Sequence, residues 1–189
     1  IIKVNIEQKK EDKIRQLKLS FLNIIMNKEN KKEAVTYLLI ILFIILMRTY
    51  VVTPVRVSGS SMANTLKNGE ILLLNKFEYR FSDIKRFDIV VVKAHGERII
   101  KRVIWLPGET LKYENGILYI NDKMIEEDYL DEVTKDFTYE GKIPDECYFV
   151  MGDNRGDSLD SRYFGCFPKK DILGHASFVL FPFAKFGKL

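Results

Sequence analysis

The longest hydrophobic run in the chain lies near its N-terminus. From Ala34 to Met47 the sequence reads AVTYLLIILFIILM, in which Thr36 is the one residue outside the apolar and aromatic set. Extended to Val52 the segment has 19 residues, close to the roughly 20 that a bilayer-crossing helix needs. A buried core helix is the alternative, but the next charge, Arg48, lies near one end, where its side chain can reach the interface. The pattern predicts a single transmembrane helix over 34–52.

Beyond this run the pattern changes to short strands. Segments rich in Val, Ile, Leu, Tyr and Phe alternate with Gly, Asn, Asp and Pro, and no long helical periodicity follows residue 55. The dipeptide Asn115-Gly116, between TLKYE and ILYIN, is typical of a two-residue hairpin. We expect strands at Tyr50–Val57, Ile71–Phe77, Asp88–Val92, Arg98–Leu106, Ile117–Ile120, Cys147–Met151 and Ser177–Phe181.

These elements define the predicted fold class and domains. The protein should be mainly β, with one N-terminal transmembrane helix followed by a compact all-β domain of sandwich or partly closed barrel type. The boundaries follow from the hydrophobic run: an N-terminal segment over 1–33, the anchor over 34–52 and the β domain over 53–189. The β domain begins next to the anchor, so we expect it to lie against the membrane surface.

The charge distribution sets the expected orientation. The net charge is +4, and residues 1–33 hold nine Lys/Arg and five Asp/Glu, which leaves 21 of each for the rest of the chain. A nucleic-acid-binding protein usually carries its basic excess on the folded module, so nucleic acid is not an expected partner. Basic residues before a membrane span instead place the N-terminus in the cytoplasm and the β domain outside it.

The N-terminal region leaves other possibilities open. A cleavable signal peptide also combines a basic start with an apolar stretch, but no small-x-small site follows Met47, where the chain reads RTYVVTPVRV. Residues 17–26 form a second apolar patch that is too short to span a membrane and suits an interfacial helix. Because the chain begins at Ile1 rather than Met, we expect further sequence upstream.

Cysteine and histidine limit the chemistry. Cys147 and Cys166 bracket a polar segment, and either a disulfide or two buried thiols would suit them. The two histidines, His95 and His175, have no spacing that pairs them with each other or with cysteine. A zinc site is therefore not expected, and a Ser-His-Asp triad is disfavoured.

Two polar clusters interrupt the strands early in the β domain. In VSGSSMANTL, Val57–Leu66, a strand runs into a Gly-Ser-Ser turn. Most such turns are structural, but they also expose a serine hydroxyl beside free backbone N–H groups. In RIIKRVIWLPGE, Arg98–Glu109, Lys101 and Arg102 point to opposite faces of a β-branched strand, so one of them lies away from solvent. Either the side chain snorkels at a sheet edge, or a buried lysine has a lowered pKa and acts as a base.

The third cluster is MGDNRGDSLDSRYFG, Met151–Gly165. Its composition suits a solvated loop, but a strand before it and an aromatic pair after it attach it to the fold. An ion pair between Asp160 and Arg162 would stiffen it, and a stiff polar loop positions the groups of a functional site.

Together these segments resemble the type I signal peptidase family over about residues 37–187. The resemblance lies in an apolar anchor followed in order by SGSSMANTL, IIKRVIWLPGE and GDNRGDSLDSRYFG. It implies that Ser61, before Met62, is the nucleophile and that Lys101, before Arg102, is the general base. It further implies that the Ser158 hydroxyl orients the lysine amine, and that the structural ionic residues are Asp153, Asp160 and Arg162. A lysine rather than a histidine at 101 corresponds to the prokaryotic type.

Several positions depart from the family pattern. Asn64 stands where the family usually has Pro, and Phe87 and Trp105 stand where Gly is common. Loss of the proline removes a fixed backbone angle, so the turn that carries the serine should be less rigid. Gly59 cannot offer a hydroxyl to an oxyanion, which leaves the Ser61 N–H with Ser60 or Ser58. Ser60 itself is a minor alternative for the nucleophile.

The resemblance implies a membrane-bound serine endopeptidase that removes signal peptides from exported preproteins. The preprotein would bind as an extended strand on a sheet edge, with small residues before the cut, and would form an acyl-enzyme. No metal or organic cofactor is implied; the partners are exported preproteins and the lipid bilayer. Two alternatives remain: a self-cleaving Ser-Lys repressor-like domain, and a non-catalytic membrane-tethered domain that binds peptides.

Overall fold

The structure is a computed structural model that describes residues 11–20 and 28–189. The chain divides into two compact units, one ending at Met47 and one spanning Arg48–Leu189. Each is described by itself.

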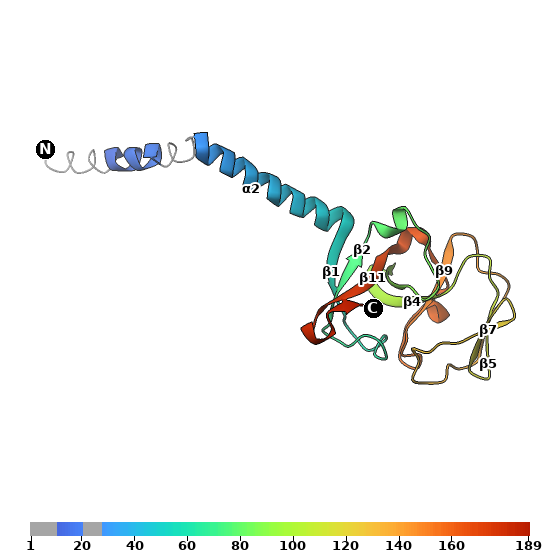
Figure 1. Ribbon diagram of the computed structural model, residues 1–189. Helices are drawn as coiled ribbons and strands as arrows, with labels where there is room; N and C mark the ends of the chain where they lie inside the picture. The colour runs from blue at the N-terminus through green and yellow to red at the C-terminus, as the bar shows by residue number, and fades with distance from the viewer. Residues whose placement is uncertain (1–10, 21–27) are drawn as a thin grey trace. The chain divides into compact units, whose positions relative to one another are not determined.

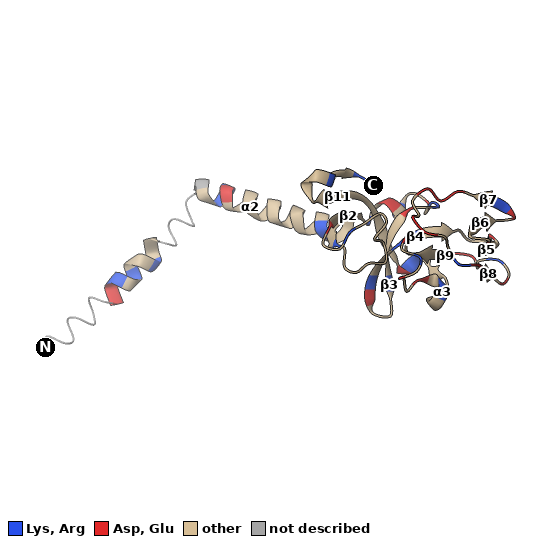
Figure 2. Cartoon of the chain, turned by 90° about the horizontal axis from the view of Figure 1, so that it is seen from below, with Lys and Arg blue, Asp and Glu red and all other residues tan. Residues whose placement is uncertain are grey.

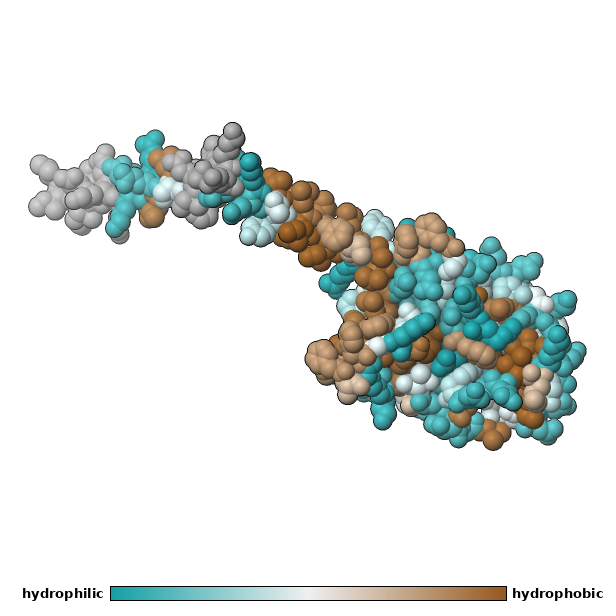
Figure 3. Space-filling model, in the orientation of Figure 1, coloured by the Kyte–Doolittle hydropathy of each residue, from teal (hydrophilic) through white to brown (hydrophobic). Residues whose placement is uncertain are grey.

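The N-terminal unit is helical where it is described. Residues 11–20 form a helix, whereas 21–26 of the expected interfacial patch lie outside the described residues. Helix α2 spans Lys28–Leu46, and its large apolar side chains from Val35 to Leu46 are exposed. Most of this helix is without charged residues (Figure 2), and the face seen in Figure 3 is largely hydrophobic. The candidate membrane span covers Asn30–Val51, 22 residues with a mean hydropathy of 2.2 and none of its hydrophobic window buried. A helix that is apolar all round and not buried in protein has the surface expected of a lipid-embedded segment.

The second unit is built from antiparallel strands, which confirms the mainly β prediction (Figure 1). The larger sheet has the order β1-β2-β11-β3-β4-β9-β10, with β12 paired to β11, and the smaller has the order β7-β6-β5-β8. Among the described residues the outer strands β1 and β10 do not pair, so the barrel is not confirmed. The strands are β1 Val52–Arg56, β2 Ile71–Asn75, β3 Ile89–Ala94, β4 Glu97–Trp105, β5 Leu111–Glu114, β6 Ile117–Ile120, β7 Lys123–Ile125, β8 Phe137–Tyr139, β9 Cys147–Met151, β10 Phe167–Pro168, β11 Ile172–Phe181 and β12 Gly187–Lys188.

Helical turns connect the strands. The π-helix η1, Met47–Val51, precedes β1, and the helix α3, Ser161–Phe164, follows the polar loop after β9. Three short 3₁₀ turns complete the unit: η2 Glu78–Arg80, η3 Lys169–Asp171 and η4 Phe183–Lys185.

The expected strands agree with the structure best where the hydrophobic pattern is continuous. Ile117–Ile120 and Cys147–Met151 are confirmed to the residue, and Asn115 and Gly116 form the predicted hairpin with positive φ angles. The strand expected at Ser177–Phe181 is β11, which begins at Ile172 rather than at Ser177. Its N-terminal half contains Gly174 and His175, which masked the pattern.

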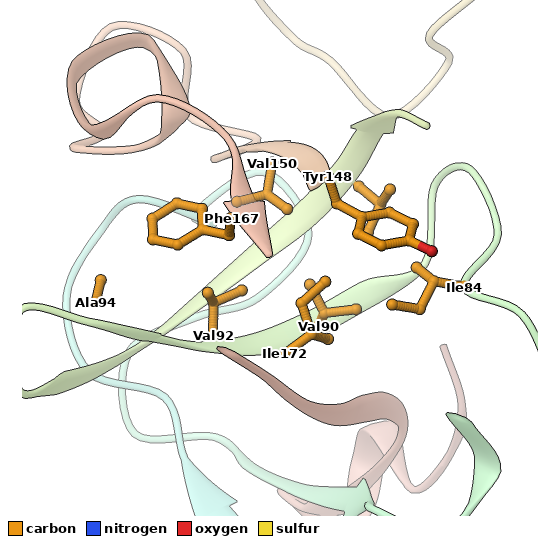
Figure 4. Close-up of a cluster of buried hydrophobic side chains, with 9 residues drawn as sticks. Ile84, Val90, Val92, Ala94, Tyr148, Val150, Phe167 and Ile172 are labelled. Carbon is orange, nitrogen blue, oxygen red and sulfur yellow. The ribbon is translucent and has the colours of Figure 1, made fainter. Parts of the chain in front are cut away.

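Strand β4 is central to the layout of the larger sheet. It pairs with β3 from Glu97 to Arg102 but with β9 only from Arg102 to Trp105. Among the described strands none pairs with 97–101 on the second side, so this stretch presents a free sheet edge. One face of the sheet is covered by a core that includes Val90, Val92, Val103, Val150 and Phe167 (Figure 4).

The smaller sheet is an insertion between β4 and β9. Trp105 packs edge-to-face against Tyr113 and Phe149, with ring centroids 5.7 and 5.0 Å apart. A buried ion pair adds a second link, because Arg155 of the loop after β9 contacts Glu127 at 2.7 Å. The structure also joins Cys147 and Cys166 in a disulfide, which resolves the two readings that the sequence left open.

Candidate active site

Ser61 lies on a tight turn between β1 and β2. The Ala63 N–H donates to the Ser60 carbonyl at 2.9 Å, and the Leu66 N–H donates to the Met62 carbonyl at 2.6 Å. The Met62 and Leu66 side chains are buried in a core cluster below the turn. Apolar anchors at 62 and 66 therefore hold the turn on the domain while the half-buried Ser61 faces the surface.

Lys101 lies on β4 and reaches this serine. Its side chain is 2% exposed, and its Nζ lies 2.6 Å from Ser61 Oγ. Burial lowers the pKa of the Lys101 ammonium, because the charged form loses its water. Asp160 and Asp153 act against this shift and Arg162 acts with it, and the net direction is downward.

The sequence predicts that Lys101 or Arg102 lies away from solvent, and the structure buries both. Arg102 is 8% exposed and forms a bidentate pair with the fully buried Asp153, through Nε at 2.9 Å and Nη2 at 2.6 Å. Thr65 donates its hydroxyl to the same carboxylate. Neither side chain snorkels at a sheet edge: Lys101 is buried beside Ser61, and Arg102 is buried with Asp153 of the polar loop after β9 as its partner.

The expected pairing of Asp160 with Arg162 is also present. Arg162 donates from Nε at 2.9 Å and from Nη2 at 2.8 Å, and the Gly152 N–H donates at 3.0 Å. Burial alone would raise the pKa of Asp160, but the bonds from Arg162, Gly152 and Ser158 together hold this pKa below its ordinary value. Asp160 is thus an ionised, fully bonded carboxylate beside Lys101.

Ser158 and Ser60 take other partners than the sequence suggested. The Ser158 hydroxyl donates to Asp160 at 2.7 Å, and in the described part of the chain it makes no hydrogen bond with Lys101. The Ser60 hydroxyl donates to the Asp157 carboxylate, so it is not free to face an oxyanion.

Two residues of the polar loop were missed at the level of sequence. Gly152 lies between the site's two serines, and a β-carbon there would overlap Ser158 Oγ and the Ser61 carbonyl oxygen. Asn154 donates its backbone N–H to that same carbonyl at 3.0 Å. The signal for Gly152 was available, because a glycine at the end of a buried strand often marks close approach of another backbone.

A cleft of about 550 Å³ opens beside the serine. Its walls come from the chain before Ser61 and from the free edge of β4, and they include Val57, Ser58, Gly59, Ile99, Ile100 and Lys101. Such a cleft suits an extended peptide, because both walls offer backbone groups to a third strand. Among residues 11–20 and 28–189 no group of three or more His, Cys, Asp or Glu side chains is placed to hold a metal ion.

Comparisons with known proteins identify the family of the chain. Residues 31–181 match the family model described as signal peptidase, peptidase S26. The chain belongs to this family. It is 39% identical to a signal peptidase I of Bacillus amyloliquefaciens, over 85% of this chain and 96% of that protein. It is 42% identical to a signal peptidase I of Bacillus caldolyticus, over 74% of this chain and 85% of that protein.

The chain is also similar to a signal peptidase I from Enterococcus faecalis with a known crystal structure. The two are 40% identical, the match covers 50% of this chain and 97% of the other, and the TM-score is 0.47. As a member of the S26 family the chain is a serine peptidase, a hydrolase of signal-peptide processing. Family membership decides against the repressor-like domain. The non-catalytic peptide-binding alternative is tested by cleavage of a model preprotein.

Gly152→Ala tests the close approach of the loop to the serine turn. We expect cleavage of a model preprotein to fall at least about tenfold, because the added methyl group must displace the Ser61 carbonyl or Ser158. Gly156→Ala is the matched control, since a β-carbon there makes only ordinary contacts with Glu132 and activity should stay within about twofold. Equal activity of the two variants would contradict the packing described.

Proposed function

We propose that this S26 peptidase removes signal peptides with Ser61 as nucleophile and Lys101 as general base. The observation that supports this most directly is the 2.6 Å contact between Lys101 Nζ and Ser61 Oγ, made by a buried lysine whose pKa is lowered. Lysine is a base only when neutral, and burial is the usual cause of a neutral lysine in a protein. The two histidines, His95 and His175, make no hydrogen bond with Ser61 among the described residues.

The preprotein enters the cleft as an extended strand along residues 97–101. Its backbone pairs with the free edge of β4, and its side chains point alternately toward and away from the walls. The apolar side chains of Ile99 and Ile100 leave shallow subsites. These subsites accept small residues at the first and third positions before the scissile bond.

Neutral Lys101 accepts the Ser61 hydroxyl proton while Oγ bonds to the scissile carbonyl carbon. The carbonyl electrons move to the oxygen, and the Ser61 N–H stabilises the resulting anion. When the tetrahedral intermediate collapses, the C–N bond breaks and the Lys101 ammonium returns the proton to the leaving amine. Water then attacks the acyl-enzyme, with Lys101 again accepting a proton. The C–Oγ bond breaks, Lys101 returns the proton to Ser61 Oγ, and the signal peptide leaves with a free carboxylate.

The ionic residues hold this pair in place. Asp153 with Arg102 and Asp160 with Arg162 support the two sides of Lys101. Orientation of the lysine amine by the Ser158 hydroxyl stays a prediction; the bond of Ser158 to Asp160 places that hydroxyl in the same network.

The chain acts at the cell membrane in this proposal. Residues 1–33 are cytoplasmic, 34–52 span the bilayer, and 53–189 form the extracytoplasmic catalytic domain. The 22-residue candidate span, with a mean hydropathy of 2.2, and the basic N-terminal segment support this arrangement. Anchoring enzyme and preprotein in one bilayer raises their effective concentration.

Ser61→Ala tests the nucleophile. We expect cleavage of a model preprotein in detergent or lipid to be abolished, since no hydroxyl remains to form the acyl-enzyme, while the thermal unfolding midpoint is kept. Ser60→Ala should still cleave. An inactive Ser60→Ala protein beside an active Ser61→Ala protein would move the nucleophile by one residue.

The pH profile and a charge-conserving variant test the base. Lys101 can act as a base only when its amine is neutral. The rate should therefore fall as the pH decreases through the lowered pKa of Lys101 and the amine takes up a proton. Lys101→Arg should lose activity by at least about a thousandfold, since arginine stays protonated. Arg102→Lys keeps a cation beside Asp153 and should cost far less. A rate that stays flat far below neutrality would exclude this lysine.

Protease accessibility tests the topology. Protease added outside intact cells or spheroplasts should digest the chain beyond Val52 and leave the first 33 residues protected. Permeabilised cells serve as the control for cleavage of the N-terminal segment. Protection of the C-terminal domain in intact spheroplasts would reverse the orientation.

A further inference from the structure

The backbone N–H of Ser61 is unpaired. In the described part of the chain it donates to no backbone or side-chain acceptor, although the turn around it is well bonded. An N–H group left free beside a nucleophile is the donor that an oxyanion requires, provided that its direction is fixed before the substrate arrives. Its direction depends on the peptide plane that joins Ser60 to Ser61.

That plane is held from its other side. The Ser60 carbonyl oxygen accepts two hydrogen bonds, from the Ala63 N–H at 2.9 Å and from Asn154 Nδ2 at 3.2 Å. In a planar trans peptide the C=O and N–H bonds point in opposite directions. Holding the Ser60 carbonyl toward Asn154 therefore turns the Ser61 N–H away from the polar loop.

Hydrogen bonds fix both the backbone and the side-chain amide of Asn154. Its backbone N–H donates to the Ser61 carbonyl at 3.0 Å, and its Oδ1 accepts from the Asp157 N–H at 3.2 Å. With Oδ1 bound to Asp157, Nδ2 must face Ser60. The Asp157 carboxylate in turn accepts the Ser60 hydroxyl, which closes a ring of contacts around the turn.

The turn supplies only part of this support, through the Ala63 N–H. Asn64 was expected to loosen the turn, and its Nδ2 is buried without a hydrogen bond among the described residues. The loop after β9 supplies the rest, through Asn154 and Asp157. This loop lies more than 90 residues further along the chain, since Ser60 and Asn154 have a sequence separation of 94.

We propose that Asn154 is a positioning residue that aims the Ser61 N–H at the oxyanion, and that Asp157 holds Asn154 and Ser60 in the orientation this requires. The inference rests on the proposed function, because it assigns the Ser61 N–H to the transition state. It adds two positioning residues: Asn154 acts on the peptide plane that joins Ser60 to Ser61, and Asp157 acts on Asn154.

Because an oxyanion exists only in the transition state, loss of this support lowers kcat and leaves KM nearly unchanged. Asn154→Ala should lower kcat about tenfold, less than the 10²–10³ for losing a donor itself, since Ala63 still holds the Ser60 carbonyl. Asp157→Ala should lower it several-fold, and Asp157→Asn, which keeps an acceptor for Ser60, should recover most of that loss. Asp145→Ala, an exposed aspartate on the loop before β9, is the matched control.

A substrate-matched peptide aldehyde separates positioning from a general structural role. The Ser61 hydroxyl adds reversibly to its carbonyl, so its Ki reports the oxyanion site. We expect the Ki to rise about as much as kcat falls in the Asn154 and Asp157 variants. If a fraction of the molecules were simply misfolded, the apparent kcat would fall with an unchanged Ki and a lowered unfolding midpoint, and the proposal would be wrong.

The two levels of the proposal fail differently. If the wild type cleaves and Ser61→Ala does not, the proposed function stands, and a wild-type kcat in Asn154→Ala would then overturn the positioning role alone. If Ser61→Ala still cleaves, the nucleophile is misassigned and the positioning role falls with it.

Discussion

A lysine amine buried against a serine hydroxyl is the constraint on which the rest of this domain depends. Removing an ammonium from water is costly, and that cost lowers the pKa of Lys101 in the direction that the proposed general base requires. Two carboxylates lie close enough to reverse the effect. Each carboxylate is paired with its own arginine, Asp153 with Arg102 and Asp160 with Arg162. The positive charge of each arginine offsets the attraction between the carboxylate and the lysine ammonium. The ion pairs therefore stabilise the site, and the net shift of the Lys101 pKa stays downward.

The same arrangement explains which features were predictable from sequence. Strong periodicity gave the hairpin at Asn115-Gly116, the strand at 147–151 and the long apolar helix, because each depends on neighbouring residues. The order of the three polar clusters was sufficient to suggest the family and to bring Ser61 and Lys101 into one hypothesis. The short strands β7, β10 and β12 have two or three residues each and carry too little pattern to be recognised.

Partners between distant segments could not be read from the sequence. Asp153 was expected to be structural, but nothing local assigned it to Arg102 or to the Thr65 hydroxyl. Ser158 was expected to face the lysine, and its bond to Asp160 depends on how the loop after β9 folds back on itself. Gly152 was overlooked because its importance arises from the Ser61 carbonyl, which approaches it from a segment some ninety residues earlier.

The residues of the site are far apart in the sequence, so they leave the ribosome at different times. A ribosome delivers the Ser61 turn 40 residues before Lys101 and more than 90 before the loop that clamps it. The inserted sheet must also be synthesised before β9 can pair with β4, since it occupies the chain between them. Contacts of such long sequence separation form late and slowly. The serine turn, the lysine and the loop that binds the turn can therefore meet only after the chain has been synthesised past β9.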